Sequence, residues 1–416
     1  MSAASSSPRS ILWLNQLDPG HPWAGGAERH IHEVGRRLVA AGHRVTVVAE
    51  RFGELPAEEW RAGMRILRPV RRGFLHAWVV ANAGRLVRQL SVDVVVGDLS
   101  KIVPWGHRSL GGRPLVSVVR HFNGRTLFTE APFPAAPVLW AVERATPAFL
   151  RSADLITESA ATETILAGLG ATPSRISRIP PGVDSSVFSP DPSDRSGSPL
   201  VVYVGRIKQY KRVDLAVRAF ARVLAHRPDA EFHIAGGGSD HDRIVALVRE
   251  LGLTRSIRFL GLLPTDEIVR LYRRAWVHVQ PSYAEGWGLT ALESMACGTP
   301  VVAFATGSLP ETVGPLCADL LAEEGRLDSL TEALERGLAR PESSDPLAAA
   351  RLAEYARRFT WEATAERYAA VLDRVVRRHA RPTPSPVTDR LRRPSRARGL
   401  APGDGSDRAT DHAEPG

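Results

Sequence analysis

Two glutamates eight positions apart flank a glycine-rich turn in the second half of the chain. Glu285 lies on a loop, and Glu293 lies about two turns farther along, inside the predicted helix Leu289–Ala296. The turn Gly286–Gly288, with Trp287 at its centre, leaves the first amides of that helix free to hold a phosphate. Two carboxylates at this separation can accept hydrogen bonds from the hydroxyls of a sugar and of a ribose. The alternative is structural, with Glu285 capping the helix and Glu293 on its solvated face.

A basic group follows the predicted strand Leu200–Val204. Gly205 and Arg206 come directly after the strand, and Lys211 comes five residues after Arg206. An arginine and a lysine at the carboxyl end of a parallel strand suit a diphosphate, because they stabilise the charge that builds on it as it leaves. The chain has only three lysines, and Lys208 is the alternative to Lys211 as the phosphate ligand. A solvated basic loop is the alternative to both.

A pair of glycines, Gly25 and Gly26, precedes the predicted helix Ala27–Ala41. Paired glycines let a backbone approach a ligand closely and leave helical N–H groups free for an anion. A flexible loop entering a helix is the alternative.

These three groups lie where predicted strands lead into helices, and this alternation is typical of parallel sheets in an α/β protein. The predicted strands of the first half are Ser10–Asn15, Val45–Ala49, Val92–Val96, Leu115–Val119 and Leu155–Thr157, with helices Ala27–Ala41 and Phe74–Leu90. Those of the second half are Leu200–Val204, Glu231–Ala235, Ile257–Leu260, Val277–Gln280 and Val301–Phe304, with helices Val213–His226, His241–Leu251, Thr265–Ala275 and Leu289–Ala296. Doubly wound sheets bind ligands at the carboxyl ends of their strands, so we expect the site in a cleft between two such domains.

The length of 416 residues suits two domains with additions. The segment 185–199 is rich in Ser, Pro and Asp and separates the two strand series. Thr360 is a predicted N-cap. We therefore predict domains at 1–190 and 200–360, a linker at 191–199, a closing helix at 361–380 and a disordered tail at 381–416.

Composition excludes fibrous, wholly disordered and membrane-spanning classes, with 44% hydrophobic and 24% charged residues. Cys297 and Cys317 each lie in an apolar stretch, which indicates neither a disulfide nor a metal framework. The chain shows no signal-peptide pattern and no window of about 20 apolar residues, so we expect a cytoplasmic protein. The net charge of +9 favours anionic partners.

The spacing of Glu285 and Glu293 resembles the signature of the family 4 retaining glycosyltransferases, which have the GT-B fold. Further landmarks of that family match in order over about residues 10–378. They are Gly25–Glu28, Gly42–Val47, Ile179–Asp184, Gly205-Arg206 with Lys211, Ala235–Gly238, Gly307 with Glu311, and Phe359–Trp361. The resemblance implies two doubly wound, Rossmann-like domains facing each other across a cleft, with the closing helix packed back on the first.

The resemblance also implies roles for the matching residues. Arg206 and Lys211 would neutralise the donor diphosphate. Glu293 would bind the ribose hydroxyls, Glu285 the transferred sugar, and His121 would lie near the reacting sugar. The remaining donor contacts would come from Gly25, Gly26, Gly205, Gly236, Gly286, Trp287, Gly288 and Leu289. Transfer would proceed with retention through an oxocarbenium-like state, with no cofactor and no metal ion.

Two further motifs have structural alternatives. Ser308 and Glu311 have the spacing of a capping box, in which Glu311 returns to the Ser308 amide, as an alternative to a ligand role for Glu311. The run Asp240–Asp242 is similar to the metal-binding motif of another glycosyltransferase fold, but it opens a predicted helix, where Asp is an ordinary cap. We favour capping there.

Residues 61–90 contain seven arginines and no acidic residue, with Phe74, Leu75, Trp78, Val79 and Leu86 among them. A basic helix with an aromatic and aliphatic face suits the anionic inner face of a membrane, which would favour a lipid-linked acceptor. The alternative is a helix that buries this face in the core of its own domain.

The resemblance thus implies a retaining hexosyltransferase of polysaccharide biosynthesis that uses a UDP- or GDP-sugar and a glycan, lipid-linked or small-molecule acceptor. A GT-B nucleotide-sugar epimerase or hydrolase is the alternative within the fold, and it would turn over its donor without an acceptor. A basic polyanion-binding protein is the alternative from another class. The basic stretch Arg390–Arg398 lacks interleaved aromatic residues, so we expect no nucleic-acid partner.

Overall fold

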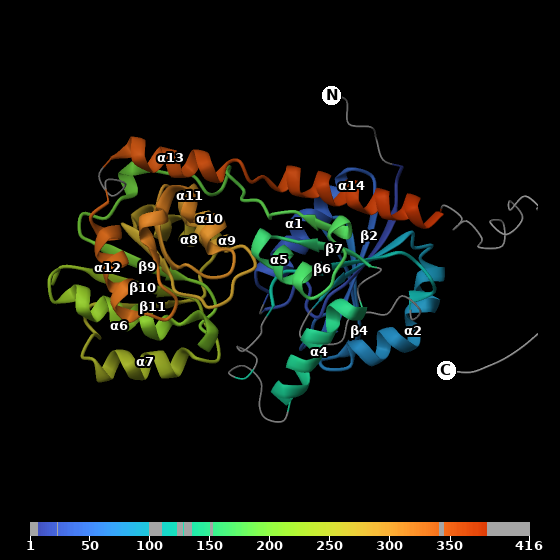
Figure 1. Ribbon diagram of the computed structural model, residues 1–416, viewed down its shortest axis with the longest axis horizontal. Coiled ribbons are helices and arrows are strands. Elements are labelled where there is room, and N and C mark those ends of the chain that lie inside the picture. Colours follow the sequence, from blue (N-terminus) through green and yellow to red (C-terminus); the bar gives the residue numbers. More distant parts are fainter. Residues whose placement is uncertain are drawn as a thin grey trace, which may run out of the picture.

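The computed structural model describes residues 7–22, 24–99, 110–122, 128, 135–149, 153–340 and 345–380 (Figure 1). The predicted disordered tail, residues 381–416, lies outside the described residues, and so does Lys101. Strands and helices alternate through two parallel-sheet domains. The predicted domain bounds at residues 190 and 200 stay a prediction.

The first domain contains one eight-stranded sheet in the order β3-β4-β2-β1-β5-β6-β7-β8, in which the neighbours are parallel except β3 and β4. Its strands are β1 (Ser10–Leu14), β2 (Arg44–Arg51), β3 (Glu58–Arg61), β4 (Met64–Arg71), β5 (Val94–Asp98), β6 (Leu115–Val119), β7 (Asp154–Thr157) and β8 (Ile176–Arg178). Its described helices are α1 (Gly26–Ala40), α2 (Leu75–Gln89), α4 (Ala135–Phe149) and α5 (Ala160–Gly168).

Both faces of this sheet are covered, and the alternation of side chains along β1 shows how. Ile11 and Trp13 pack with α1 and with α14 (Trp361–Ala380), the last helix among the described residues. Leu12 and Leu14 pack with α2 on the opposite face. Strands buried on both faces read as continuous apolar runs, which explains why β1 was predictable.

The second domain contains a six-stranded parallel sheet in the order β11-β10-β9-β12-β13-β14. Its strands are β9 (Leu200–Val204), β10 (Glu231–Ala235), β11 (Ile257–Gly261), β12 (Val277–Gln280), β13 (Val301–Phe304) and β14 (Leu321–Ala322). Its helices are α6 (Val213–Leu224), α7 (His241–Glu250), α8 (Thr265–Arg274), α9 (Leu289–Ala296), α10 (Leu309–Thr312), α11 (Gly314–Cys317), α12 (Leu327–Leu338) and α13 (Pro346–Ala356). The predicted strands here are confirmed, with the same bounds except at the end of β11.

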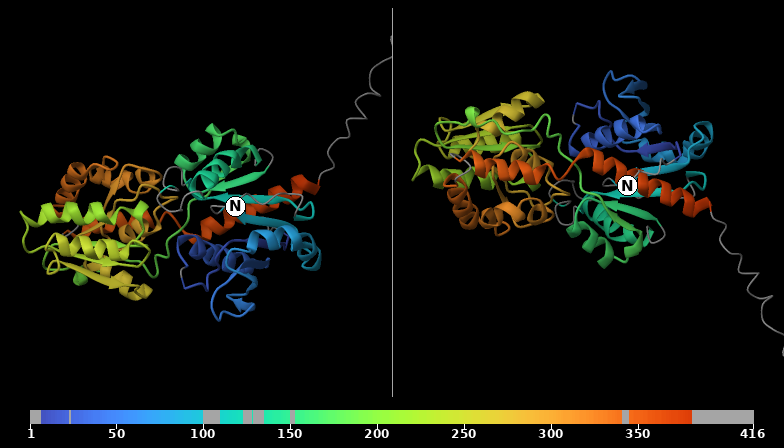
Figure 2. Two further views of the ribbon diagram at one scale, coloured as in Figure 1. Left: turned by 90° about the horizontal axis from the view of Figure 1, so that it is seen from below. Right: turned by 90° about the horizontal axis from the view of Figure 1, so that it is seen from above.

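The chain crosses between the domains twice, and the two crossings touch. The second crossing joins α13, over the second domain, to α14, which runs along the first domain (Figures 1 and 2). At the first crossing, a Cβ added to Gly182 would lie 2.2 Å from the Trp361 backbone nitrogen. Beside it, the Val183 N–H donates to the Phe359 carbonyl oxygen over 2.9 Å. Thr360 caps α14 as predicted, since its Oγ1 accepts from the amide of residue 363 over 3.1 Å.

Residues 61–90 do not form one basic surface. Arg65 and Arg68 lie on strand β4, and buried Arg68 forms a two-bond ion pair with Asp18, at 2.6 and 2.7 Å. Helix α2 buries one face in the core of the first domain through Leu75, Val79, Ala83 and Val87. The core interpretation is confirmed for that face, while Phe74 and Val80 remain exposed.

Candidate active site

Both sheets reverse their strand order at one point, and the predicted site residues follow the strands there. In the first sheet β1 lies between β2 and β5, and in the second β9 lies between β10 and β12. Doubly wound sheets bind ligands at the carboxyl ends of strands beside such a reversal. The segments after β9 and β12 carry Arg206, Lys211 and Glu285. Those after β1 and β6 carry Gly25 and His121.

A cleft of about 720 Å³ lies between the two domains, which is within the range of small-molecule sites. From the first domain it is lined by residues that include Gly25, Gly26, Glu28, Arg29, Arg120, His121 and Glu158. From the second domain they include Gly205, Arg206, Lys211, Gly236, Glu285, Gly286, Trp287, Gly288, Leu289 and Glu293. The structure therefore brings every residue that the sequence predicted for the site to one cleft.

Glu285 is held by two side chains of its own domain. Lys211 forms an ion pair with its carboxylate, and Gln280 at the end of β12 donates to Oε1 over 2.7 Å. Thr290 of α9 in turn donates to Gln280 over 3.1 Å. Burial alone would raise the pKa of Glu285, but Lys211 and the hydrogen bonds outweigh burial and hold the pKa below its ordinary value. The cleft thus contains a carboxylate that is ionised at neutral pH beside a fixed ammonium.

Arg206 is a cation with no carboxylate partner among the described residues. Its guanidinium donates to the Tyr210 hydroxyl over 3.4 Å. It lies opposite Gly25 of the first domain, where an added Cβ would be 3.7 Å from Arg206 Cζ. Lys208, the alternative to Lys211, is not among the described residues that line the cleft. An anion beside Glu285 would therefore meet the Arg206 guanidinium and the Lys211 ammonium of the second domain.

The turn 285–288 packs closely against both domains because two of its positions lack a side chain. Gly288 has a φ of +85°, in the left-handed region, and an added Cβ would lie 3.0 Å from Leu309 Cδ2. Gly286 faces the first domain. A Cβ added there would lie 2.8 Å from both the Arg120 carbonyl oxygen and a carboxylate oxygen of Glu158. The turn that carries Glu285 is thus in backbone contact with the segment that precedes His121.

Glu293 is buried on α9, and its partner comes from the other domain. Arg29 of α1 forms an ion pair with Glu293 and also lies over the Phe188 ring, 5.2 Å from its centroid. Burial raises the pKa of Glu293, and Arg29 opposes this effect. The ion pair engages one carboxylate oxygen of Glu293, Oε1.

The glycine pair starts α1 at the domain interface. A Cβ added to Gly26 would lie 3.3 Å from Leu289, the first residue of α9. The expectation that the helical N–H groups here are free for an anion stays a prediction. The N–H of Gly25, which precedes the helix, donates to Glu28 over 2.7 Å. The physical reason is helix capping, because a carboxylate in the first turn satisfies the amide that precedes the helix.

His121 follows β6 and lies half-buried in the cleft. Burial lowers the pKa of His121, Glu285 acts against this effect, and Lys211 adds to it. A lowered pKa keeps the imidazole neutral at pH 7. The ring can therefore hydrogen-bond a ligand without adding a charge.

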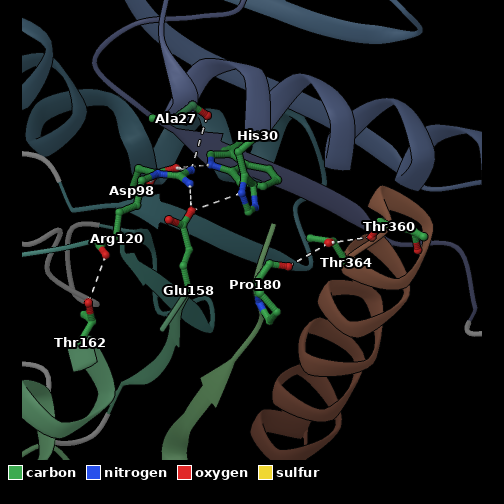
Figure 3. A network of polar contacts seen from close by, with 10 residues as sticks. Ala27, His30, Asp98, Arg120, Glu158, Thr162, Pro180, Thr360 and Thr364 are labelled. Atoms are coloured by element: carbon green, nitrogen blue, oxygen red, sulfur yellow. Dashed lines mark hydrogen bonds and ion pairs between the residues drawn. The ribbon is translucent and has the colours of Figure 1, made fainter. Parts of the chain in front are cut away.

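A buried charge network next to His121 was not predicted from the sequence (Figure 3). Arg120 donates to Asp98 over 2.9 and 3.2 Å and forms an ion pair with Glu158. His30 Nδ1 lies 3.4 Å from Glu158 Oε1. Burial would lower the pKa of Arg120, but the two carboxylates raise it, so the guanidinium stays charged. The sequence feature that could have predicted this network is a polar residue at the end of each of the adjacent strands β5, β6 and β7.

The two halves of the chain match two glycosyltransferase families. Residues 24–187 match Glycosyltransferase Family 4, and residues 187–359 match Glycosyl transferases group 1. The D-inositol 3-phosphate glycosyltransferase of Thermobispora bispora is 30% identical over 405 residues, covering 88% of this chain and 94% of that protein. This chain belongs to the family 4 (group 1) glycosyltransferases. The family resemblance seen in the sequence is confirmed.

Solved structures show that this glycosyltransferase has the GT-B fold. Sucrose-phosphate synthase from Thermosynechococcus elongatus is 25% identical with a TM-score of 0.71, over 86% of this chain and 96% of that one. HepE from Anabaena in complex with UDP and glucose is 20% identical with a TM-score of 0.67, over 88% of this chain and 99% of that one. The predicted fold of two doubly wound domains across a cleft is therefore confirmed.

The predicted capping box in this glycosyltransferase is wrong. Glu311 does not return to the Ser308 amide, and its two carboxylate oxygens accept instead from the Ala160 and Ala161 amides of the first domain. The physical reason is that the start of α5 offers two amides and the positive end of a helix dipole.

Asp240 lies at the predicted N-cap position, but its side chain does not bind the helix amides. Asp240 occupies the N-cap position of α7, but both of its carboxylate oxygens bind Arg243, each over 2.7 Å. A bidentate guanidinium is the stronger partner.

In the described part of the chain, no group of three or more His, Cys, Asp or Glu side chains could hold a metal ion. None of the helices described there is both long and apolar enough to cross a membrane.

Proposed function

We propose that this glycosyltransferase moves a hexose from a UDP- or GDP-sugar to an acceptor hydroxyl, with retention of anomeric configuration and without a metal ion. The observation that carries the proposal is the meeting of Glu285, Lys211 and Arg206 in one cleft. The solved HepE complex with UDP and glucose, although it shares only the fold at 20% identity, makes UDP the first nucleotide to test.

Arg206 and Lys211 bind the diphosphate in this proposal. A guanidinium and an ammonium that meet in one cleft stabilise the negative charge that develops on the leaving diphosphate. They supply charge stabilisation of the kind that a metal ion gives in other enzymes, so no ion is required. The amides of the turn 285–288, at the N-terminus of α9, add further hydrogen-bond donors.

Glu285 binds the hydroxyls of the transferred sugar, and Glu293 binds the ribose. Because Lys211 and Gln280 already engage the Glu285 carboxylate, we assign it to binding rather than to nucleophilic attack. For retention, the acceptor approaches from the side of the leaving diphosphate, whose oxygens take the acceptor proton. His121 supplies a neutral hydrogen-bonding group beside the sugar.

Thermal unfolding with UDP, GDP and ADP, each with and without magnesium, tests the donor site. A nucleotide at 100 times its Kd stabilises the state that binds it by about 2.7 kcal/mol, or several degrees. We expect UDP or GDP to raise the Tm without magnesium and Lys211→Ala to abolish the shift. Lys208→Ala is the matched control and should keep the shift, because Lys208 is outside the described cleft lining.

Three outcomes contradict the proposal. A shift that needs magnesium overturns metal independence, and no shift with any of the three nucleotides overturns the donor site. Consumption of the UDP-sugar at the same rate with and without an acceptor favours the epimerase or hydrolase. D-inositol 3-phosphate, from the name of the relative in Thermobispora bispora, is the first acceptor to add.

We further propose that the protein is cytoplasmic and touches the membrane peripherally through α2. Phe74 and Val80 are exposed, and the same segment carries the exposed arginines Arg71 and Arg88. An apolar and basic surface of this kind suits anionic lipid. Flotation with phosphatidylglycerol vesicles tests the contact, and equal recovery of wild type and a Phe74→Ser, Val80→Ser variant overturns it.

A further inference from the structure

Glu311 joins the two domains through the start of a helix. It lies on α10 of the second domain, and its two carboxylate oxygens accept from the Ala160 and Ala161 amides of the first, each over 2.8 Å. These amides belong to the first two residues of α5. The contact is charge-assisted. It joins the two domains in addition to the Arg29–Glu293 ion pair.

Glu311 completes the capping of α5. The first amides of a helix have no partner within the helix. The N-cap residue Ser159 accepts from the third amide, that of Thr162, over 3.2 Å. The first two amides bind Glu311, whose charge also lies at the positive end of the helix dipole. Ser159, next to α5 in the sequence, therefore binds one of the free amides, and Glu311 of the second domain binds two others.

On its own side, α10 is fixed to the turn 285–288. Ser308 donates through Oγ to the Glu285 carbonyl oxygen over 3.2 Å. Thr312 donates through Oγ1 to the Trp287 carbonyl oxygen over 2.5 Å. The helix that carries Glu311 therefore moves with the turn that carries the proposed sugar ligand Glu285.

On the other side, α5 is fixed to the segment that carries His121. Thr162 donates through Oγ1 to the Arg120 carbonyl oxygen over 3.2 Å (Figure 3). Arg120 precedes His121 and is itself held by Asp98 and Glu158. A continuous series of hydrogen bonds thus leads from the turn 285–288 through Glu311 and α5 to the opposite wall of the cleft.

We propose that Glu311 is a positioning residue for sugar transfer, whose carboxylate holds α5, and with it the Arg120–His121 segment, against the turn 285–288. This inference rests on the proposed function, because Glu285 and His121 are the groups that Glu311 aligns. Loss of the carboxylate lets the first domain move away from the donor sugar and leaves Arg206 and Lys211, the ligands of the nucleotide, in place.

Amide hydrogen exchange on the full chain measures the contact directly. Glu311→Ala removes both acceptors, and Glu311→Gln keeps one acceptor without the charge. Glu354→Ala is the matched control, since Glu354 is exposed on α13 and pairs with Arg357 of the same domain. We expect exchange at residues 160–161 to rise about tenfold in Glu311→Ala, to rise less in Glu311→Gln, and to stay at the wild-type rate in the control.

Two nucleotide measurements separate positioning from folding. In the wild type, UDP should slow exchange at residues 160–161 further, because it orders the turn 285–288. In Glu311→Ala, the Kd for UDP should stay within about twofold of the wild-type value. UDP should no longer slow amide exchange at residues 160–161 of this variant. Release of UDP from UDP-glucose, as the glucosyl group passes to water or to an added acceptor hydroxyl, should fall about tenfold in kcat at an almost unchanged KM. This is the pattern of a lost transition-state arrangement.

Each result decides the proposal. Unchanged exchange at residues 160–161 in Glu311→Ala overturns the contact in solution. Faster exchange throughout the first domain, with kcat retained, assigns Glu311 to stability and overturns the positioning role. If the wild type binds neither UDP nor GDP, the proposed function fails, while exchange without nucleotide still shows whether Glu311 joins the domains.

Discussion

The two glutamates of the cleft take their counter-charges from different domains. Glu285 is paired with Lys211 of its own domain, so its ionised form is kept in any arrangement of the two domains. Glu293 is paired with Arg29 of the other domain, and burial raises its pKa in spite of that partner. Movement of α1 away from α9 would therefore change the environment of Glu293, whereas the environment of Glu285 would stay the same.

Arg29→Met should make the stability of the protein depend more steeply on pH. The pKa of Glu293 in the folded state lies above the ordinary value of 4.5, so just above pH 4.5 the folded state binds more protons than the unfolded state. Stability therefore falls as pH rises through this window. Without Arg29 nothing opposes burial, and the window extends upward. We expect a loss of about 2 kcal/mol in urea unfolding at pH 8 and a smaller loss at pH 5.5.

Arg36→Met on the same helix is the control for this prediction. Arg36 pairs with Glu33 of its own helix, and its side chain is 37% exposed. Its loss should change stability by less than about 0.5 kcal/mol at either pH. Equal losses in Arg29→Met at both pH values would mean that Arg29 acts through its packing on Phe188 rather than through its charge.

At this scale the sequence predicted the cleft residues but not their partners. Arg206, Lys211 and Glu285 follow strands of one sheet, so the order of the elements decides the edge at which they meet. The partners of Glu293 and Glu311 come from the other domain. Which helix of that domain faces them depends on the docking of two folded bodies, and no spacing along the chain encodes it.

At the scale of elements, burial separates the predicted strands from the missed ones. Strands β9 and β13 are buried at every residue and consist of continuous apolar runs, such as Leu200–Val204. Strand β4 was missed because arginines interrupt its apolar residues. Arg65 pairs with Glu58 of β3, and Arg68 pairs with Asp18 before α1. Acidic partners from distant segments turn a sequence that resembles a basic surface into part of a sheet.

Because the two crossings touch at Gly182, we expect this position to require glycine. A Cβ there would lie 2.2 Å from the Trp361 nitrogen and 2.4 Å from the Thr360 carbonyl carbon, and both are backbone atoms that a rotamer change cannot move. We expect Gly182→Ala to destabilise the protein by about 3 kcal/mol, since one crossing has to shift. Chemical denaturation followed by circular dichroism measures this loss.

Gly197→Ala is the matched control in the predicted linker. A Cβ at Gly197 meets no atom within 4 Å, so the change should leave stability within about 0.5 kcal/mol. If Gly182→Ala is equally neutral, the two crossings separate readily, and the contact between Val183 and Phe359 adds little to the arrangement of the domains.

At the scale of the whole molecule, the end of the chain completes the core of the beginning. Helix α14 follows the second domain in sequence but covers the face of the first sheet that α1 also covers (Figure 2). Arg9 near the start of the chain pairs with Asp373, and Arg378 pairs with Asp154 of β7. His30 of the charge network lies between Trp361 and Tyr368, with ring centroids 5.5 and 5.3 Å away. The site wall around His121 is therefore supported by a helix that follows the whole second domain in the sequence.

A chain that ends at Thr360 should consequently lose the cooperative unfolding of its first domain. The side chains that it lacks in that core are Trp361, Ala365, Tyr368, Val371, Leu372 and Val375. At about 1.5–3 kcal/mol for each large apolar side chain, their removal costs on the order of 10 kcal/mol, which is comparable with the whole stability of a domain. A chain that ends at Ala380 keeps all of them and should unfold like the full chain in calorimetry. If the shorter chain unfolds in the same transitions, the first domain has a sufficient core of its own, and α14 only joins the two domains.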